Sequence, residues 1–437
     1  MYKKLKPGQL LLISYALVDL VGTLLLLLPI ASTEPGPANL VQAWFTATSA
    51  LTVTGLTVVT TATHWTMFGH MVIMILIQIG GLGLMALATI ILAMLGLRIH
   101  LGHRLLVVQD RNYFSMSGVI RLVLNIFLLT LVLESIGAVI LAFLFPGVWD
   151  NGLIEGLLFV VFHAVSAFNG AGFDLTGQSL EPFRDYLGIN LVMIALIILG
   201  SLGFVVLQEL FLVRKWHRLS LHSRMVLLVT GAVTLLGSIF FLASEYNHTL
   251  AGAPPEDKIV ISLFQAATRT AGFTTVPIMS WSEPFIFLMI IMMFIGASPG
   301  SVGGGIKTTT FGTVVLAVWS IVRGKKAVVL FEREIAPESV TKAFTVVVMA
   351  GMLVAIITLL LMIVEGLPLV PVLFEVVSAM ATVGLSTGIT SHLSPFGMAL
   401  IGLVMFVGRI GVLTVVVVLA GKEKRRSHYM KEDILIG

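Results

Sequence analysis

Four short segments, each with a central glycine, carry backbone that could coordinate a cation. They read FTATSALTVTGLTVV (45–59), FHAVSAFNGAGFDLTG (162–177), FQAATRTAGFTTV (264–276) and FEVVSAMATVGLSTG (374–388). Three of them align without gaps on a phenylalanine, a serine, an alanine and the glycine. The segment at 264–276 aligns on its glycine but is two residues shorter back to its phenylalanine. Glycine permits backbone angles that turn carbonyl oxygens inward without a Cβ clash, and carbonyl oxygens that face one another can replace a cation's hydration shell.

The four glycines and the residues before them are therefore the candidate filter residues: Thr54, Gly55, Ala171, Gly172, Ala271, Gly272, Val383 and Gly384. No side-chain carboxylate is common to the four segments. Calcium and magnesium favour such ligands, so a monovalent cation fits better. Thr382-Val383-Gly384 also repeats the T-V-G of potassium-channel filters. The alternative is that each glycine only packs transmembrane helices, but its recurrence in four aligned segments favours a cation path.

The run FIGASPGSVGGGIKTTTFGTVV (294–315) predicts a broken helix. Five glycines and Pro299 fall within ten residues, which cannot hold a regular helix. A helix that breaks at membrane depth must be buried in protein or line a cavity. The alternative is a kink without a role in transport.

Two motifs in this run resemble enzyme sites. Residues 296–300 match G-x-S-x-G, but that motif needs a preceding strand and a histidine partner, whereas the context here is apolar helix. Residues 300–307 resemble a phosphate-binding loop, but Ile306 stands where its lysine is required. The spans also lack a paired aspartate site, a metal-binding histidine pair and a serine–histidine pair, so no enzyme is predicted.

Three cations lie in or beside apolar sequence: Arg269, Lys307 and Arg409. Arg409 falls within the last span, where a charge is costly and normally faces the bundle interior; the alternative is pairing for structure alone. Lys307 is expected at the cytoplasmic edge of the broken helix, placed to snorkel. Arg269 precedes Gly272 and is expected to brace the filter by hydrogen bonds rather than to contact the ion. Asn169 is the second candidate for filter support.

The composition requires a membrane to position these residues. Of 437 residues, 57% are hydrophobic and 11% charged, against about 25% charged in soluble domains, and the mean hydropathy is +1.05. These values exclude a cytosolic globular enzyme and a disordered chain. Zero cysteines exclude disulfides and Cys-ligated metals. A β-barrel does not fit, because its strands alternate over about 10 residues.

Eight apolar runs are long enough to cross a membrane, which takes about 20 residues. They lie at 9–30, 70–97, 119–145, 188–213, 225–244, 285–319 (interrupted), 344–364 and 396–421. With eight spans both termini share one side, and 21 of the 26 basic residues fall on that side. The positive-inside rule therefore predicts that both termini are cytoplasmic.

A second glycine motif recurs 24 to 28 residues after each filter glycine, beginning at Gly80, Gly200, Gly296 and Gly408. Close helix packing is the favoured reading of Gly80, Gly200 and Gly408. We thus predict an all-α polytopic membrane protein, with four tandem helix–pore loop–helix repeats around a pseudo-fourfold pore and eight transmembrane helices. The predicted repeats are 1–100, 101–218, 219–325 and 326–437, the last with a basic C-terminal tail.

With its S-A-x-x-x-x-G and R-T-A-G-F pore motifs, this order resembles the TrkH/KtrB/HKT superfamily of potassium transporters over essentially the whole chain. Eight spans without an extra N-terminal helix pair are most similar to the KtrB branch, the membrane subunits of bacterial Ktr systems. The resemblance implies potassium uptake, often sodium-dependent, by a homodimer in the bacterial cytoplasmic membrane. It also implies a cytosolic nucleotide-binding regulatory ring of the KtrA type. Relatives with serine at the first filter position conduct sodium better, so Gly55 argues for potassium.

The resemblance further implies that an intramembrane loop at 296–308 lies under the filter and gates it, with Arg409 beside the loop in the permeation path. The gate residues are then Gly296, Ala297, Ser298, Pro299, Gly300, Ser301, Val302, Gly303, Gly304, Gly305, Lys307 and Arg409. No bound cofactor and no nucleic acid are expected; potassium is the transported ion, with sodium as an activator. The basic loops could bind membrane lipid or a partner ring.

A secondary cation transporter with alternating access is the rival interpretation, since broken helices and repeats also mark those proteins. Against it, the repeats here are fourfold and parallel, whereas inverted repeats would alternate in direction.

Overall fold

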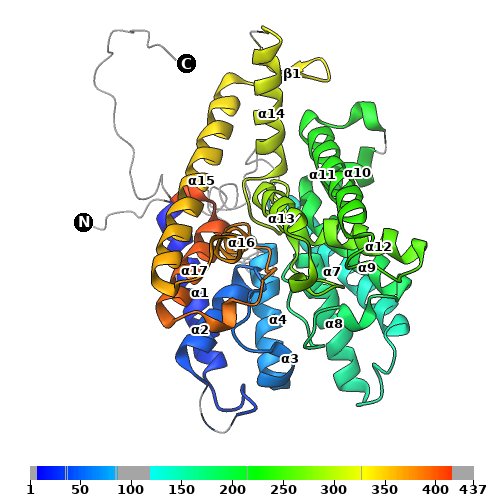
Figure 1. The fold of residues 1–437 in the computed structure, drawn as a ribbon, viewed down its shortest axis with the longest axis vertical. Helices are drawn as coiled ribbons and strands as arrows, with labels where there is room; N and C mark the ends of the chain where they lie inside the picture. The colour runs from blue at the N-terminus through cyan, green and yellow to red at the C-terminus, as the bar shows by residue number, and fades with distance from the viewer. Residues whose placement is uncertain are drawn as a thin grey trace.

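The computed structural model describes residues 7–34, 36, 38–83, 86, 119–213, 215–325 and 327–415. This part of the chain is helical apart from loops and one small antiparallel hairpin (Figure 1). The hairpin joins β1 (Val329–Leu330) to β2 (Arg333–Glu334), with Val329 opposite Glu334 and Leu330 opposite Arg333.

Four long helices are individually long and apolar enough to cross a membrane. They are α1 (Pro7–Leu26), α7 (Val119–Leu144), α11 (Leu221–Glu245) and α15 (Pro337–Glu365). Their outward faces expose large apolar side chains, among them Leu17, Leu128 and Leu236 at 61 to 66%. Such faces suit hydrocarbon and not water.

A shorter helix follows each long helix and ends just before a filter glycine. These are α2 (Leu40–Leu51), α8 (Leu153–Asn169), α12 (Pro255–Ala267) and α16 (Leu369–Met380). The 3₁₀ turn η3 (Thr268–Thr270) extends α12. We call these four the pore helices. The remaining short elements are α3 (Thr61–His64), η1 (Glu181–Phe183), η2 (Trp216–Arg218), η4 (Ile278–Ser280) and η5 (Thr390–His392).

A further helix then leads away from each filter segment, and we call these four the closing helices: α4 (Met67–Leu82), α9 (Leu187–Leu202), α13 (Glu283–Ile295) and α17 (Pro395–Ile410). A glycine with positive φ ends each one. The φ values are 83° at Gly83, 92° at Gly203, 67° at Gly296 and 96° at Gly411.

The prediction of an uninterrupted span over 188–213 is wrong. The helix after α9, α10 (Phe204–Val213), turns away from it by 101°. Gly203 makes this turn in a conformation that other residues rarely adopt, and a Cβ there would lie 2.6 Å from the Pro299 carbonyl oxygen.

A broken helix is therefore present at two places. One is the bend between α9 and α10, and the other is the predicted break, where α13 ends at Ile295 and α14 (Thr308–Val322) begins after the loop. Within the described residues, four helices are continuous and long enough to span, or five spans with the bent pair α9–α10; eight spans stay a prediction. The predicted spans at 70–97 and 396–421 run beyond the described residues; α4 and α17 end at Leu82 and Ile410.

Pore helices and closing helices alternate around a closed ring. α4 packs between α2 and α8, α9 between α8 and α12, and α17 between α16 and α2. α13 completes the ring by packing on η3 and α16. The long helices lie outside this ring, while α14, the hairpin and the start of α15 project at one end of the molecule (Figure 1).

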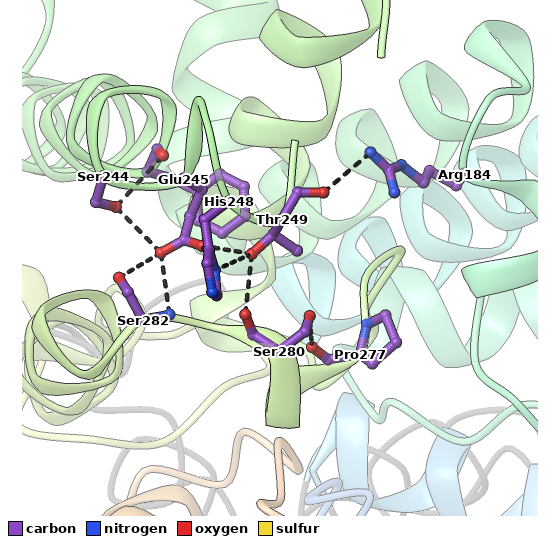
Figure 2. Close-up of polar contacts among 9 residues, drawn as sticks. Arg184, Ser244, Glu245, His248, Thr249, Pro277, Ser280 and Ser282 are labelled. Atoms are coloured by element: carbon purple, nitrogen blue, oxygen red, sulfur yellow. Dashed lines mark hydrogen bonds and ion pairs between the residues drawn. The ribbon is translucent and has the colours of Figure 1, made fainter. Parts of the chain in front are cut away.

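A buried carboxylate on α11 and a half-buried one on α15 tie these two long helices to closing helices; Figure 2 shows the first, Glu245. Glu245, the last residue of α11, is fully buried and accepts hydrogen bonds from the backbone N–H (3.1 Å) and hydroxyl of Ser282, which precedes α13. Thr249 and Ser244 donate to the same carboxylate. Glu365, which ends α15, likewise accepts from the N–H (3.1 Å) and hydroxyl (2.6 Å) of Ser394, the N-cap of α17. A carboxylate is favourable at a helix N-terminus, so these contacts fix where each closing helix begins.

Candidate functional site

All eight predicted filter residues come together in one ring. Each filter glycine faces a carbonyl oxygen of the next segment. That carbonyl belongs to the residue just before the next filter glycine, so that Gly55, for example, faces Ala171. A Cβ built on the glycine would lie 2.1 Å from that oxygen for Gly55 and Ala171, 2.7 Å for Gly172 and Ala271, 2.3 Å for Gly272 and Val383, and 2.1 Å for Gly384 and Thr54. The order follows the chain and closes from the fourth segment to the first. Since the four φ values are 69 to 93°, both conformation and space require glycine here.

Each segment leaves its pore helix in the same way. The residue before the filter glycine donates its N–H to the carbonyl of a serine or threonine near the helix end. The pairs are Thr54 to Ser49 (2.8 Å), Ala171 to Ser166 (2.7 Å), Ala271 to Thr268 (2.8 Å) and Val383 to Ser378 (2.9 Å). In the third segment the tighter turn η3 replaces part of the helix, which accounts for the two missing residues. Our sequence alignment missed Thr268 for this reason.

The hydroxyls of these four residues form hydrogen bonds with the backbone of the filter segments. Ser49 accepts from the N–H of Gly55 at 3.0 Å, and Ser378 accepts from the N–H of Gly384 at 3.1 Å. In the two other segments the hydroxyl donates instead: Ser166 to the Phe173 carbonyl at 2.7 Å, and Thr268 to the Phe273 carbonyl. All four are fully buried, so each segment has a fixed polar partner inside the protein.

Backbone strain is concentrated in the first and fourth segments. Val53 and Thr382, each two residues before a filter glycine, have φ of 57° and 50°. β-branched residues rarely adopt this region, and holding one there costs about 1–3 kcal/mol. Gly170 takes the same place in the second segment with φ 68°.

The segment 296–308 forms a folded loop and not a simple kink. The Ala297 N–H donates to the Gly304 carbonyl, and the Thr308 N–H donates to the Ala297 carbonyl, each at 3.1 Å. Gly296 and Gly305 lie so close that a Cβ on Gly296 would be 2.6 Å from the Gly305 Cα.

This loop lies against the filter segments. The Gly304 N–H donates to the Thr382 hydroxyl at 2.8 Å, and a Cβ on Gly304 would lie 2.9 Å from the Ala381 carbonyl oxygen. Two further bonds fix the loop to α9: Ser298 N–H to the Ser201 carbonyl (3.0 Å) and Val302 N–H to the Gly200 carbonyl (3.4 Å).

All three predicted cations donate to carbonyls of this loop or its flank. The Arg269 Nη1, buried in the protein, donates to Gly296 at 2.7 Å and to Met292 at 3.4 Å. Lys307 Nζ donates to the Gly303 carbonyl and, at 3.3 Å, to that of Gly304.

Arg409 of α17 bridges the loop and α4. It donates to Val302 in the loop through one nitrogen and to the Gly80 carbonyl, in α4, through the other. A small cavity of about 70 Å³ lies between the loop and the ends of α4 and α17, lined among others by Ser301, Lys307 and Arg409. A second cavity of about 340 Å³ opens on the α14–α15 side of the loop, lined in part by Pro299, Thr309 and Val346.

The first glycine of the second motif packs on a pore helix, which confirms the packing prediction for Gly80, Gly200 and Gly408. A Cβ would lie 2.0 Å from the Leu51 carbonyl oxygen, 1.7 Å from that of Phe168 and 2.1 Å from that of Met380, respectively.

Asn169, the last residue of α8, points away from the ring into a polar cluster. Its Nδ2 donates to Glu134 in α7 at 2.8 Å and to the Val165 carbonyl at 2.9 Å. Gln78 of α4 donates to the other oxygen of Glu134 at 3.1 Å. In the first unit, Thr48 donates to buried Asp19 of α1 at 3.0 Å. Sequence reasoning gave these carboxylates no role, although a single acid inside a long apolar run was the available signal.

Comparisons with known proteins give the same type of molecule. The family TrkH, described as cation transport protein, matches residues 13–428. The chain is 41% identical to "Ktr system potassium uptake protein D" and 40% identical to "Ktr system potassium uptake protein B", both of Bacillus subtilis, over 99% of this chain and 98% and 97% of theirs. It is 36% identical to "Potassium/sodium uptake protein NtpJ" of Enterococcus hirae, over 100% of this chain and 98% of the relative.

The fold is similar to the crystal structure of the potassium transporter TrkH from Vibrio parahaemolyticus, with a TM-score of 0.74. That likeness covers 96% of this chain and 86% of the other at 19% identity.

Proposed function

Because the chain belongs to the TrkH family of cation transport proteins, we propose that it takes up potassium through the ring of filter segments. Membership of a transport family confirms that the chain is not an enzyme, and its apolar helices identify a multi-pass membrane protein. The single observation that carries the proposal is the closed contact of four glycines with four neighbouring carbonyls. The names of the 40 and 41% identical relatives, both potassium uptake proteins, point to the same ion.

The ring would act by substituting for water. Backbone carbonyls of Thr54, Gly55, Ala171, Gly172, Ala271, Gly272, Val383 and Gly384 replace the hydration shell of a dehydrated potassium ion. The pore helices and their buried hydroxyls hold these carbonyls in place, so that the oxygens do not have to reorganise as each ion passes. Asn169 and Arg269 support this arrangement from outside the ring.

The loop at 296–308 is the proposed gate. It packs beside the filter segments, and Arg269, Lys307 and Arg409 hold it through its carbonyls. Loss of these bonds would free the loop, while their formation keeps the path closed. Arg409 also adds a positive barrier to a cation on the path.

The architecture proposed is four tandem repeats, at 1–100, 101–218, 219–325 and 326–437, around a pseudo-fourfold axis. The recurring order of long helix, pore helix, filter segment and closing helix supports it. The charge pattern of the sequence supports insertion in a bacterial cytoplasmic membrane with both termini inside.

A partner and a second ion are part of the proposal. Relatives named as proteins of a Ktr system point to a multi-component assembly, for which we propose a homodimer controlled by a cytosolic nucleotide-binding ring. The name of the relative that takes up potassium and sodium points to sodium as the second ion, for which we propose the role of an activator.

Ion flux into liposomes tests the proposal. Purified protein should admit potassium in preference to sodium, and Gly272→Ala should abolish that preference because a Cβ would meet the Val383 carbonyl at 2.3 Å. Gly351→Ala is the matched control, since nothing lies within 4 Å of its Cβ position. Equal sodium and potassium flux in the wild type would contradict the proposal.

A further inference from the structure

One polar position recurs in every pore helix, directly after the phenylalanine on which the segments align. It holds Thr46, His163, Gln265 and Glu375, and all four are buried, with exposures of 0 to 2%. Polar groups without partners are costly in such surroundings. In three of the four segments, at His163, Gln265 and Glu375, this side chain contacts the chain just beyond the filter glycine.

In two segments the contact lies three residues beyond the filter glycine. His163 Nε2 lies 3.4 Å from the Leu175 N–H, while its Nδ1 lies 2.8 Å from the Phe159 carbonyl. Gln265 donates to the Thr275 hydroxyl at 2.9 Å. Both side chains thus form hydrogen bonds with the stretch of chain that follows the filter glycine, at Leu175 and Thr275. We call this stretch of each segment the outer limb.

Glu375 makes the largest number of these hydrogen bonds. Its carboxylate accepts from the Ser386 hydroxyl at 2.8 Å, from the Thr390 hydroxyl, and from the backbone of Thr387, which is again three residues beyond the glycine. Ser386 in turn accepts the N–H of Gly388 at 2.9 Å. Three donors of the limb thus converge on one fully buried side chain, which fixes the fourth outer limb at three positions.

The filter glycine of this segment therefore lies between two anchors. Ser378 holds the Gly384 N–H at 3.1 Å, and Glu375 fixes the limb that begins two residues later. The direction of the Gly384 carbonyl is set by the backbone between these anchors. When the outer anchor is lost, the carbonyl is free to tilt and to accommodate a smaller ion.

We propose that Glu375 is a positioning residue that sets the preference of the filter for potassium over sodium, acting through the outer limb and not by contact with the ion. This inference rests on the proposed function. Neutral Gln265 in the third segment shows that an amide also fits the position, so geometry and hydrogen bonding, rather than charge, are what Glu375 supplies.

The test compares potassium and sodium flux in liposomes for Glu375→Ala, Glu375→Gln and the wild type. Glu375→Ala should lower the potassium-to-sodium ratio about tenfold, equivalent to about 1.4 kcal/mol. Glu375→Gln should recover most of that ratio, because the amide can still bridge the limb hydroxyls. Glu365→Gln is the matched control: this carboxylate in the same unit caps α17 through Ser394 and should leave the ratio unchanged.

The outcomes separate the two claims. A wild type without potassium preference would defeat the proposed function. A selective wild type with an unchanged ratio in folded Glu375→Ala would overturn the inference, as would Glu375→Gln no better than alanine. If Glu375→Ala does not fold, the double variant Ser386→Ala/Thr390→Val removes the two hydroxyl donors; it should lower the ratio likewise, and an unchanged ratio would overturn the inference.

Discussion

Among single residues, Gly55 has the most direct consequence for ion selectivity. A Cβ there would lie 2.1 Å from the Ala171 carbonyl oxygen, at a backbone φ of 87°. Gly55→Ser should therefore displace that carbonyl and add a hydroxyl ligand, which raises sodium flux relative to potassium in an ion-replacement uptake assay. Gly231→Ser on α11 is the control, because its Cβ position has nothing within 4 Å. An unchanged ratio of sodium to potassium flux in Gly55→Ser would show that Gly55 is not a filter residue.

Ser378 makes a second prediction at this scale. Ser378→Ala removes the acceptor of the half-buried Gly384 N–H, a hydrogen bond worth about 0.5–1.5 kcal/mol. We expect a lower thermal unfolding temperature in detergent. Ser14→Ala, on the exposed hydroxyl that donates to Leu10, should leave that temperature unchanged. Equal unfolding temperatures for the two variants would show that the Ser378 bond contributes little.

Individual residues also show where sequence reasoning stops. The convergence of Gly55, Gly172, Gly272 and Gly384 was predictable because the same local pattern repeats around each of them. The role of Thr268 was not predictable. In the other three segments the equivalent serine lies six residues before the filter glycine, whereas the 3₁₀ turn η3 places Thr268 only four residues before Gly272. Glu375 was missed for a related reason: Thr46, His163 and Gln265 share its position but not its chemistry.

At the scale of elements, the loop at 296–308 makes the clearest prediction. Deletion within 300–305 should raise basal potassium flux, because the segment that we propose to block the path is shortened. Arg409→Ala should act in the same direction by removing a charge, worth about 4 kcal/mol at 4 Å in a dielectric near 20 before screening. Tracer flux in proteoliposomes measures both. A deletion variant that purifies as a stable protein with flux at or below the wild type would identify a rigid pore wall instead.

The bend between α9 and α10 shows what hydropathy alone does not predict about a span. Runs such as those at 70–97 and 188–213 are apolar throughout, so hydropathy reads each as one helix. The end of α4 at Gly83 and the bend at Gly203 both use a glycine with positive φ, and the bend at Gly203 also depends on the close approach of the distant Pro299 carbonyl. Hydropathy averaged over a window of residues does not report on backbone conformation or on contacts with distant segments.

For the whole molecule, α14, the β1–β2 hairpin and the start of α15 project from one end (Figure 1). Together with the basic loops predicted on the cytoplasmic side, this end is where we expect a regulatory ring to dock. A nucleotide-binding protein of the KtrA type should co-purify with the membrane protein at low salt and dissociate as salt screens the charges. Recovery of no ring protein at low salt would contradict docking of that partner.

The central claim is that four backbone segments form one ion site, and anomalous diffraction from crystals grown in rubidium tests it most directly. The account predicts a rubidium peak inside the ring formed by Gly55, Gly172, Gly272 and Gly384, within coordination distance of carbonyls from all four segments. Absence of a peak there, with rubidium bound instead beside carboxylates such as Asp19, Glu134 or Glu375, would contradict it.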